Sequence, residues 1–261
     1  MSNTKYSILG ALVLSVSLLA GTAPAAILIQ DNFDSYATQA AFVAAWPVVS
    51  TSVPSGTLST VQASSVPQSI NQATTAQRNQ RAFTESGTPS AGAPIEFSFD
   101  FYDADDSLSP FRQQSNLQDS PASASGQLIS MGLNNNQASA GDGGNFYMAR
   151  ILGYDGGTGL SAYFKLNQGS APLRSTGWHN LKAVLTNTDI KFYVDNILSA
   201  TEVTAVQATR SYDLVRIGSG LSSTAEAFVD NVLVQTIPEP TAFALFGVAA
   251  AGMAMRRRRR A

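Results

Sequence analysis

The chain has 261 residues and a mass of 27.4 kDa, and 44% of its residues are hydrophobic, enough to bury a sizeable core. Only 13% of the residues are charged, about half the usual share, and the sequence contains no cysteine and a single histidine. These counts exclude disulfides, thiolate nucleophiles, cysteine-ligated metals and multi-histidine metal sites within one chain.

The net charge of −2 hides an uneven distribution, because five of the sixteen basic residues form one run at the C-terminus. Between Ala26 and Ile237 the sequence contains ten basic and seventeen acidic residues, a net charge of −7. Binding to nucleic acid needs clustered cations that contact phosphates, and this part of the sequence contains no such run. Nucleic acid is therefore not an expected partner.

Residues 1–25 have the three parts of a secretory signal peptide. Lys5 precedes an apolar run from Ile8 to Ala20, and Ala23, Pro24 and Ala25 are the small residues expected before a cleavage site. The apolar run has about 13 residues, too few to cross a roughly 30 Å hydrocarbon core, so a retained anchor is the weaker alternative. The pattern predicts a signal helix cleaved after Ala25 and an exported protein that uses the secretion translocon.

Residues 26–236 are predicted to form one all-β domain, because short alternating or apolar runs are separated by Gly, Asn, Asp and Ser. In the clearest run, 95–102, Phe97, Phe99 and Phe101 share one face, as in a strand with one buried side. Only 39–46 has a helical pattern. The other predicted strands are 26–30, 127–133, 146–153, 162–166, 178–186, 190–195, 212–217 and 227–235.

Two of these strands are predicted to form a hairpin. Leu181, Ala183 and Leu185 alternate along the first strand, and the alternation resumes at Ile190 after the turn 187–189, which contains Asn and Asp. Hairpins of this kind pair antiparallel strands, so both alternating sets are expected on one buried face.

The hairpin segments 177–181 and 193–197 resemble laminin-G-like and concanavalin A-like domains, in which Trp-His opens one strand and Phe-Tyr-Val-Asp closes the next. Segments 31–34 and 229–232 are similar to the first and last strands of these domains. The resemblance implies a two-sheet jelly-roll sandwich whose first and last strands lie near each other.

Segments 50–92 and 113–126 are rich in Ser, Thr, Gln and Ala and contain few large apolar residues. A disordered linker is one interpretation. We expect weak edge strands and long loops of the sandwich instead, because no second core-sized segment precedes them and apolar residues recur in the first segment. These residues are Val61, Val66, Ile70 and Phe83.

The C-terminus carries three features in a fixed order. They are the triplet Pro238, Glu239 and Pro240, the apolar stretch 242–255, and Arg256, Arg257, Arg258, Arg259 and Arg260. This order resembles the PEP-CTERM sorting signal of Gram-negative bacteria that make extracellular polysaccharide, which a membrane peptidase called exosortase processes. The resemblance covers 238–261 and implies exosortase as a partner, with extracellular polysaccharide as a further expected partner.

The same segment can be interpreted physically. Fourteen residues reach about 21 Å as a helix, so 242–255 crosses a bilayer only with little tilt, with local thinning, or with flanking residues drawn in. The arginines stop translocation and hold the tail in the cytoplasm. We expect a transmembrane helix at 242–255 and an inner-membrane precursor that reaches the cell envelope or extracellular matrix after processing. A plain anchor with an incidental Pro-Glu-Pro is the alternative.

Catalytic residues are not expected. The single imidazole, His179, is expected to face solvent beside a buried Trp178, and no Gly-x-Ser-x-Gly elbow is present. Glu96 and Asp100 lie about 13 Å apart along a strand, whereas retaining glycosidases need about 5 to 5.5 Å, and Asp103 is expected in a turn. The leading hypothesis is a non-enzymatic protein. A carbohydrate-active enzyme, a glycoside hydrolase or lyase on the same fold, is the alternative.

No cofactor is required by the sequence, but a structural calcium ion is a prediction. Calcium needs only oxygen ligands, and Asp31 and Asp34 near the first strand could meet Asp230 on the last. The alternative is that these residues belong to edge strands and turns without an ion.

Carbohydrate-binding surfaces use exposed aromatic rings, and tyrosines are available on the predicted strands and loops. These are Tyr102, Tyr147, Tyr154, Tyr163 and Tyr193. Tyrosines also occur on ordinary sandwich exteriors, so the expectation of glycan binding rests partly on analogy with the fold.

Overall fold

The computed structural model describes residues 25–50, 52–73, 76–104, 112–119, 127–134, 144–153, 163–203, 211–220 and 225–237. All of them belong to one compact unit, Ala25–Ile237. The predicted signal peptide, Pro-Glu-Pro triplet, transmembrane helix and arginine tail lie outside the described residues. Within those residues, no helix is long and apolar enough to cross a membrane.

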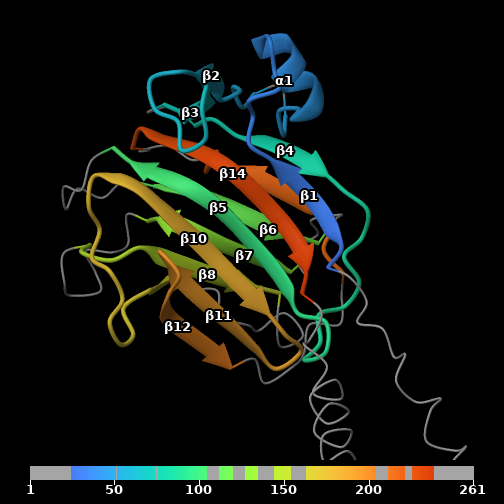
Figure 1. Cartoon of the computed structure of the whole chain (residues 1–261), viewed down its shortest axis with the longest axis vertical. Coiled ribbons are helices and arrows are strands. Elements are labelled where there is room, and N and C mark those ends of the chain that lie inside the picture. Colours follow the sequence, from blue (N-terminus) through green and yellow to red (C-terminus); the bar gives the residue numbers. More distant parts are fainter. Residues whose placement is uncertain are drawn as a thin grey trace, which may run out of the picture. The chain divides into compact units, whose positions relative to one another are not determined.

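The unit is an all-β sandwich of two antiparallel sheets (Figure 1). The larger sheet has eight strands in the order β12-β11-β10-β5-β14-β3-β2, and β1 also pairs with β14. Its strands are β1 (Ile27–Asp31), β2 (Thr57–Ser59), β3 (Ser69–Gln72), β5 (Ile95–Asp103), β10 (Gly177–Leu185), β11 (Asp189–Val194), β12 (Ile197–Val203) and β14 (Ala227–Thr236). The smaller sheet has six strands in the order β4-β13-β6-β7-β8-β9. They are β4 (Asn79–Ala82), β6 (Gln113–Gln118), β7 (Leu128–Leu133), β8 (Met148–Leu152), β9 (Tyr163–Lys165) and β13 (Leu214–Ile217).

The core lies between the sheets and is built from alternate residues of their strands. Phe97, Phe99 and Phe101 of β5 are at most 1% exposed, and Leu181 and Phe192 of the β10 and β11 hairpin are fully buried. Since side chains of a strand alternate between its faces, one apolar residue in two is enough to line a core. The predicted strand at 95–102 and the predicted hairpin are confirmed.

The first and last strands pair with each other, as expected. Asp31 of β1 lies opposite Val232 of β14 in an antiparallel ladder. The predicted short helix is also present as α1 (Gln39–Ala45), which begins where the Thr38 hydroxyl accepts a hydrogen bond from the Ala41 amide. Its buried Phe42 belongs to the core of the sandwich.

The polar segments 50–92 and 113–126 were both expected to form edge strands and loops, and the second does not agree with this expectation. Strands β2 and β4 lie at sheet edges, as expected, and Val61 and Val66 are exposed. The segment 113–118 is different, because it forms β6, which lies inside the smaller sheet with every residue buried. Of its six side chains only Leu117 is apolar, so hydrophobicity gave no sign that this strand is central.

Candidate functional site

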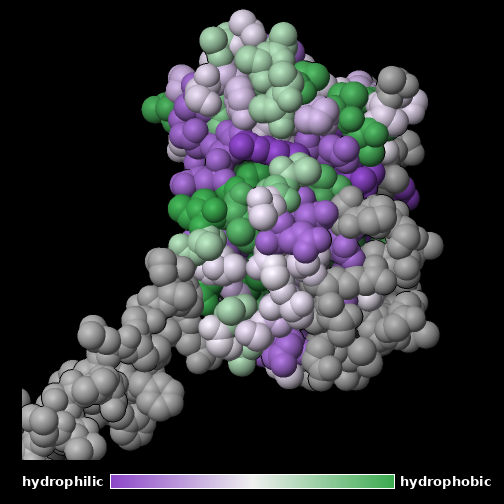
Figure 2. All heavy atoms as spheres, turned by 90° about the vertical axis from the view of Figure 1, so that its right-hand side faces the viewer, coloured by the Kyte–Doolittle hydropathy of each residue, from purple (hydrophilic) through white to green (hydrophobic). Residues whose placement is uncertain are grey.

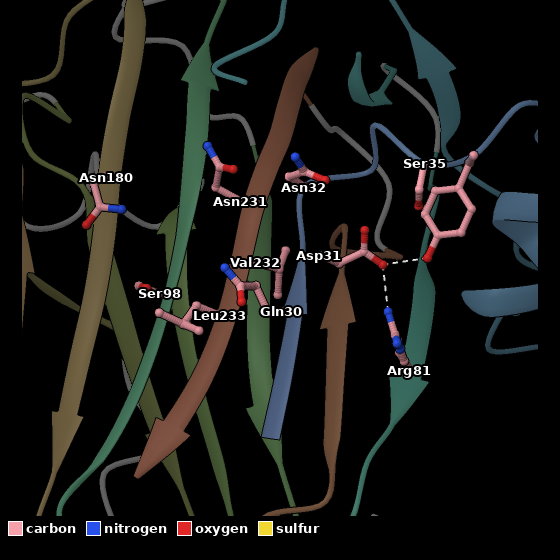
Figure 3. A pocket seen from close by; sticks show the side chains of 11 residues that line it. Gln30, Asp31, Asn32, Ser35, Arg81, Ser98, Asn180, Asn231, Val232 and Leu233 are labelled. Atoms are coloured by element: carbon pink, nitrogen blue, oxygen red, sulfur yellow. Dashed lines mark hydrogen bonds and ion pairs between the residues drawn. The ribbon is translucent and has the colours of Figure 1, made fainter. Parts of the chain in front are cut away.

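A polar pocket of about 720 Å³ lies beside β1, β5, β10 and β14 of the larger sheet (Figure 3). Its lining offers amide and hydroxyl groups from Gln30, Asn32, Asn180, Asn231, Ser35 and Ser98. Figure 2, seen from the side on which β1 and β4 lie in Figure 1, shows hydrophilic residues gathered in a band below α1. The lining can therefore bind a small polar group, but its one carboxylate already accepts hydrogen bonds from other residues of the protein.

That carboxylate belongs to Asp31, which accepts hydrogen bonds from several directions. One oxygen accepts from the Tyr36 hydroxyl and from the Arg81 guanidinium at 2.6 Å (Figure 3). The same oxygen accepts from the Trp46 indole at 2.9 Å. The other oxygen accepts from the Phe33 amide at 2.8 Å. Burial, followed by the hydrogen bond to Asp31, raises the pKa of Tyr36 to about 12. Asp31 therefore ties α1 and β4 to β1.

The three carboxylates predicted to bind calcium each accept hydrogen bonds from different protein groups. Asp34 accepts from the Gln68 amide at 3.1 Å, and Asp230 accepts from the Ser65 amide at 2.8 Å. Among the described residues, no group of three acidic or histidine side chains is placed to hold a metal ion. Protein donors already satisfy Asp31, Asp34 and Asp230, and calcium binding there stays a prediction.

Asp230 is the neighbour of Asp100, which the sequence analysis had compared with Glu96. Asp230 on β14 lies opposite Asp100 on β5, and Ser64 bridges them, donating its amide to Asp230 at 2.9 Å and its hydroxyl to Asp100 at 2.6 Å. Glu96 lies earlier on β5, opposite Gln235. Burial raises the pKa of Asp230 to about 6 although backbone amides oppose this shift. Because Asp230 has no exposed surface, the pair fastens the loop at Ser64 to the sheet.

The expected placement of His179 is wrong. His179 is 9% exposed and faces inward, whereas Trp178 lies on the outer face, with its ring centroid 5.4 Å from that of Tyr102. The reason is strand alternation, since His179 has the same parity as the buried Leu181. The outward position of Trp178 follows from the same parity.

His179 connects two segments through its ring nitrogens. Nδ1 lies 2.8 Å from the Asp195 carboxylate, and Nε2 lies 2.9 Å from the carbonyl oxygen and 3.0 Å from the hydroxyl of Ser175. The order Ser, His, Asp is that of a hydrolytic triad. However, Nε2 can bond the Ser175 carbonyl oxygen only as an N–H donor, and in that role it cannot accept the proton of the Ser175 hydroxyl. The geometry therefore fits a structural connection.

Asp103 is also not in a turn, because it is the last residue of β5 and forms a buried ion pair. The Arg174 guanidinium binds its two oxygens at 2.9 and 3.2 Å, and both side chains are at most 2% exposed. Arg174 also donates to the carbonyl oxygen of Gly144 at 3.3 Å. Sequence reasoning missed this pair because 71 residues separate its members and neither lies in a recognisable motif.

The outer face of the smaller sheet carries a continuous row of polar side chains, which we call the polar face. Cross-strand partners in the row are Gln80, Arg216, Asn116, Ser130, Arg150 and Tyr163. Further members, on the same strands or next to them, are Arg78, Gln114, Gln118 and Lys165. The opposite face of the same strands contributes Leu117, Ile129, Ala149 and Val215 to the core.

Two amides of the polar face are buried without being satisfied. Asn116 and Gln118 are 8% and 6% exposed, and the carbonyl oxygen of each has no hydrogen-bond partner. Other buried amides bond backbone groups, such as Asn79 with Gly56 and Trp46. Most buried polar atoms in proteins have a hydrogen-bond partner, so two carbonyl oxygens without one on the same face need an explanation. On the larger sheet, Gln72 is also unpaired, and nothing in the structure explains it.

Tyr163 reaches far across the polar face. Its hydroxyl donates to the Gln114 side chain at 3.1 Å, although β7 and β8 lie between their strands, and Ser130 donates to the same oxygen at 2.9 Å. The Arg150 guanidinium lies 5.0 Å from the centre of the Tyr163 ring. Tyr163 is thus the predicted tyrosine that lies on the polar face.

The other predicted tyrosines are placed differently. Tyr147 is fully buried, and Tyr102 packs edge-on against Trp178 and Phe228. Tyr193 lies on β11 of the larger sheet, beneath the Lys182 ammonium. Tyr154 lies outside the described residues.

Residues 236–260 match the PEP-CTERM protein-sorting motif. The match contains the Pro-Glu-Pro triplet and all five arginines, and it marks the chain as an exported protein of a Gram-negative bacterium that exosortase processes. No curated protein matches the chain in sequence.

Solved structures show the fold alone. The T. cruzi calreticulin globular domain has 10% identity and a TM-score of 0.55 over 89% of this chain and 100% of that chain. A carbohydrate esterase from the Shiga toxin-encoding bacteriophage phi24B has 11% identity and a TM-score of 0.54 over 81% and 99%. A sialidase matches 84% of this chain, at 11% identity and a TM-score of 0.49, but this chain spans only 19% of its length. The chain is similar to these β-sandwich proteins in fold and carries a PEP-CTERM sorting motif at its C-terminus.

Proposed function

We propose that this exported protein belongs to the cell envelope or extracellular matrix and binds a glycan through the polar face without catalysing a reaction. The sorting motif supports the location. We further propose that the precursor has a signal peptide at 1–25 and an inner-membrane helix at 242–255. The Trp-His hairpin supports a jelly roll of the laminin-G-like or concanavalin A-like kind.

The observation that carries glycan binding is the pair of unsatisfied amides, Asn116 and Gln118. A buried polar atom without a partner costs about 1–3 kcal/mol, so an apolar residue would serve a purely structural position better. A carbonyl oxygen without a donor can accept from the hydroxyl group of a sugar, provided that the side chains covering these two buried oxygens move aside on binding. Tyr163 adds a half-buried ring beside them, and ligand sites combine such rings with a few placed polar groups.

The test replaces Gln118 by methionine, which has a similar volume but no carbonyl oxygen. The exported protein, purified as its host processes it, is run in native gels that contain polygalacturonate or dextran, and its melting temperature is measured. We expect Gln118→Met to keep or raise the melting temperature and to abolish retardation by the polysaccharide that retards the parent.

The matched control is Gln30→Met, which changes the pocket of the larger sheet in the same way. This variant should bind as the parent does. If Gln30→Met abolished retardation and Gln118→Met did not, the pocket would be the binding site and the proposal would be wrong.

A further inference from the structure

The two sheets differ in the charges that their strands carry. The strands of the smaller sheet, as described, contain no aspartate or glutamate, and their charged residues are Arg81, Arg150, Lys165 and Arg216. The strands of the larger sheet contain Asp31, Glu96, Asp100, Asp103, Asp189, Glu202 and Asp230. The larger sheet also carries Lys182 and Lys191, so the two sheets differ in their acids: every acidic residue on the described strands lies in the larger sheet.

Two of the arginines on the polar face lack an anionic partner. Arg78 donates to the carbonyl oxygen of Ser219, and Arg216 donates to the Gln80 side chain at 3.2 Å. Within the described part of the chain neither forms an ion pair, and the buried Nε of Arg78 has no hydrogen-bond partner. Burial lowers the pKa of both guanidinium groups, and repulsion from Arg216 lowers that of Arg78 further. Partly desolvated cations without a counter-ion favour the binding of an anion.

The backbone is shaped to hold Arg78 in this place. Gly220 has a φ of +60°, and a Cβ there would lie 2.5 Å from Nε of Arg78 and 2.6 Å from its Cζ. A side chain at Gly220 would therefore occupy the space that the guanidinium fills.

We propose that the ligand of the polar face is an acidic glycan, whose carboxylate binds Arg78 and Arg216 while its hydroxyls donate to Asn116 and Gln118. The inference rests on the proposed glycan binding and specifies its chemistry. Guanidinium groups only donate and match carboxylates in shape, whereas amide carbonyls accept from hydroxyls. Asn116 lies opposite Arg216 on the neighbouring strand, so both kinds of group lie within the span of one sugar ring.

A single-stranded nucleic acid is the competing polyanion. Its bases bind by stacking on aromatic side chains along a positively charged groove. Among the described residues of the polar face the one aromatic ring is that of Tyr163, and the Arg150 guanidinium lies over it. An acidic sugar needs no such stacking platform, so the observations favour it.

The experiment compares polygalacturonate with its fully methyl-esterified form, which has the same backbone and no charge. Binding of the exported protein is measured by affinity electrophoresis at low salt and at 0.5 M NaCl. The acid form should bind at least tenfold more tightly than the ester at low salt, and high salt should remove most of the difference. The double variant Arg78→Gln and Arg216→Gln should lose about tenfold to a hundredfold of its affinity for the acid form and keep its melting temperature.

Lys191→Gln is the control, because it removes one cation from the larger sheet, where Lys191 lies 3.7 Å from Asp189. It should change binding less than twofold. Equal binding of acid and ester, with loss in Gln118→Met, would overturn the acidic specificity and leave glycan binding intact. No binding of either polymer would overturn both. Tighter binding of a single-stranded DNA oligonucleotide than of polygalacturonate would assign the polar face to nucleic acid and overturn the inference.

Discussion

Replacing Arg174 by methionine is expected to destabilise the sandwich strongly. The change removes two hydrogen bonds to Asp103 and one to Gly144, and it leaves the Asp103 carboxylate fully buried without its cation. Breaking a buried ion pair from one side costs about 3–5 kcal/mol, and domains have a free energy of unfolding of about 5–15 kcal/mol. Urea unfolding should therefore show a much lower midpoint with an unchanged slope.

The double variant Asp103→Leu and Arg174→Met distinguishes the loss of the ion pair from the loss of side-chain packing. Replacing both partners by apolar residues is often neutral, so this variant should recover most of the loss. Lys191→Gln, which breaks a half-exposed ion pair, should cost less than about 1 kcal/mol. The reasoning is refuted if Arg174→Met costs as little as Lys191→Gln, or if the double variant is no more stable than Arg174→Met.

Three further predictions concern pH, calcium and sorting. Burial raises the pKa of Asp230 from 3.8 to about 6, so the folded chain holds this proton more tightly than the unfolded chain. The resulting stabilisation, roughly 3 kcal/mol, is complete below about pH 4 and is lost as the pH rises through 6; thermal melts should show this loss in the parent and not in Asp230→Asn. A calcium ion shared by Asp31, Asp34 and Asp230 would raise the melting temperature when calcium is added and lower it with chelator, and an unchanged curve rejects the site. Glu239→Ala should leave uncleaved precursor in the inner membrane with a folded sandwich, and efficient release from a host with exosortase would contradict the role of the triplet.

Alternation of apolar residues was sufficient to predict the strands whose two faces differ. It identified β5 and the β10 and β11 hairpin, because Phe97, Phe99 and Leu181 face the core while their neighbours do not. It failed for β6, where both faces are mainly polar and Leu117 is the one apolar residue, and only the register with β7 and β13 shows which face lines the core. The parity that buries Leu181 also buries His179, whereas the resemblance to related domains implies an exposed imidazole.

Contacts between distant segments were not predictable in the same way. Arg78, Arg150 and Arg216 are scattered through an acidic sequence, so a search for basic runs finds nothing. They share the polar face because β4, β8 and β13 belong to one sheet, and that order depends on connections that no local pattern encodes. The same is true of Asp103 and Arg174.

The position of β14 has a consequence for export. This strand is the last to leave the ribosome, yet it lies inside the larger sheet and pairs with β1, β3 and β5. A chain that emerges from its N-terminus cannot complete this sheet until Thr236 has emerged, although β5 can already pair with β10 and β3 with β2. Such long-range pairing is slow to form. Completion of the larger sheet therefore waits for the strand that borders the sorting motif.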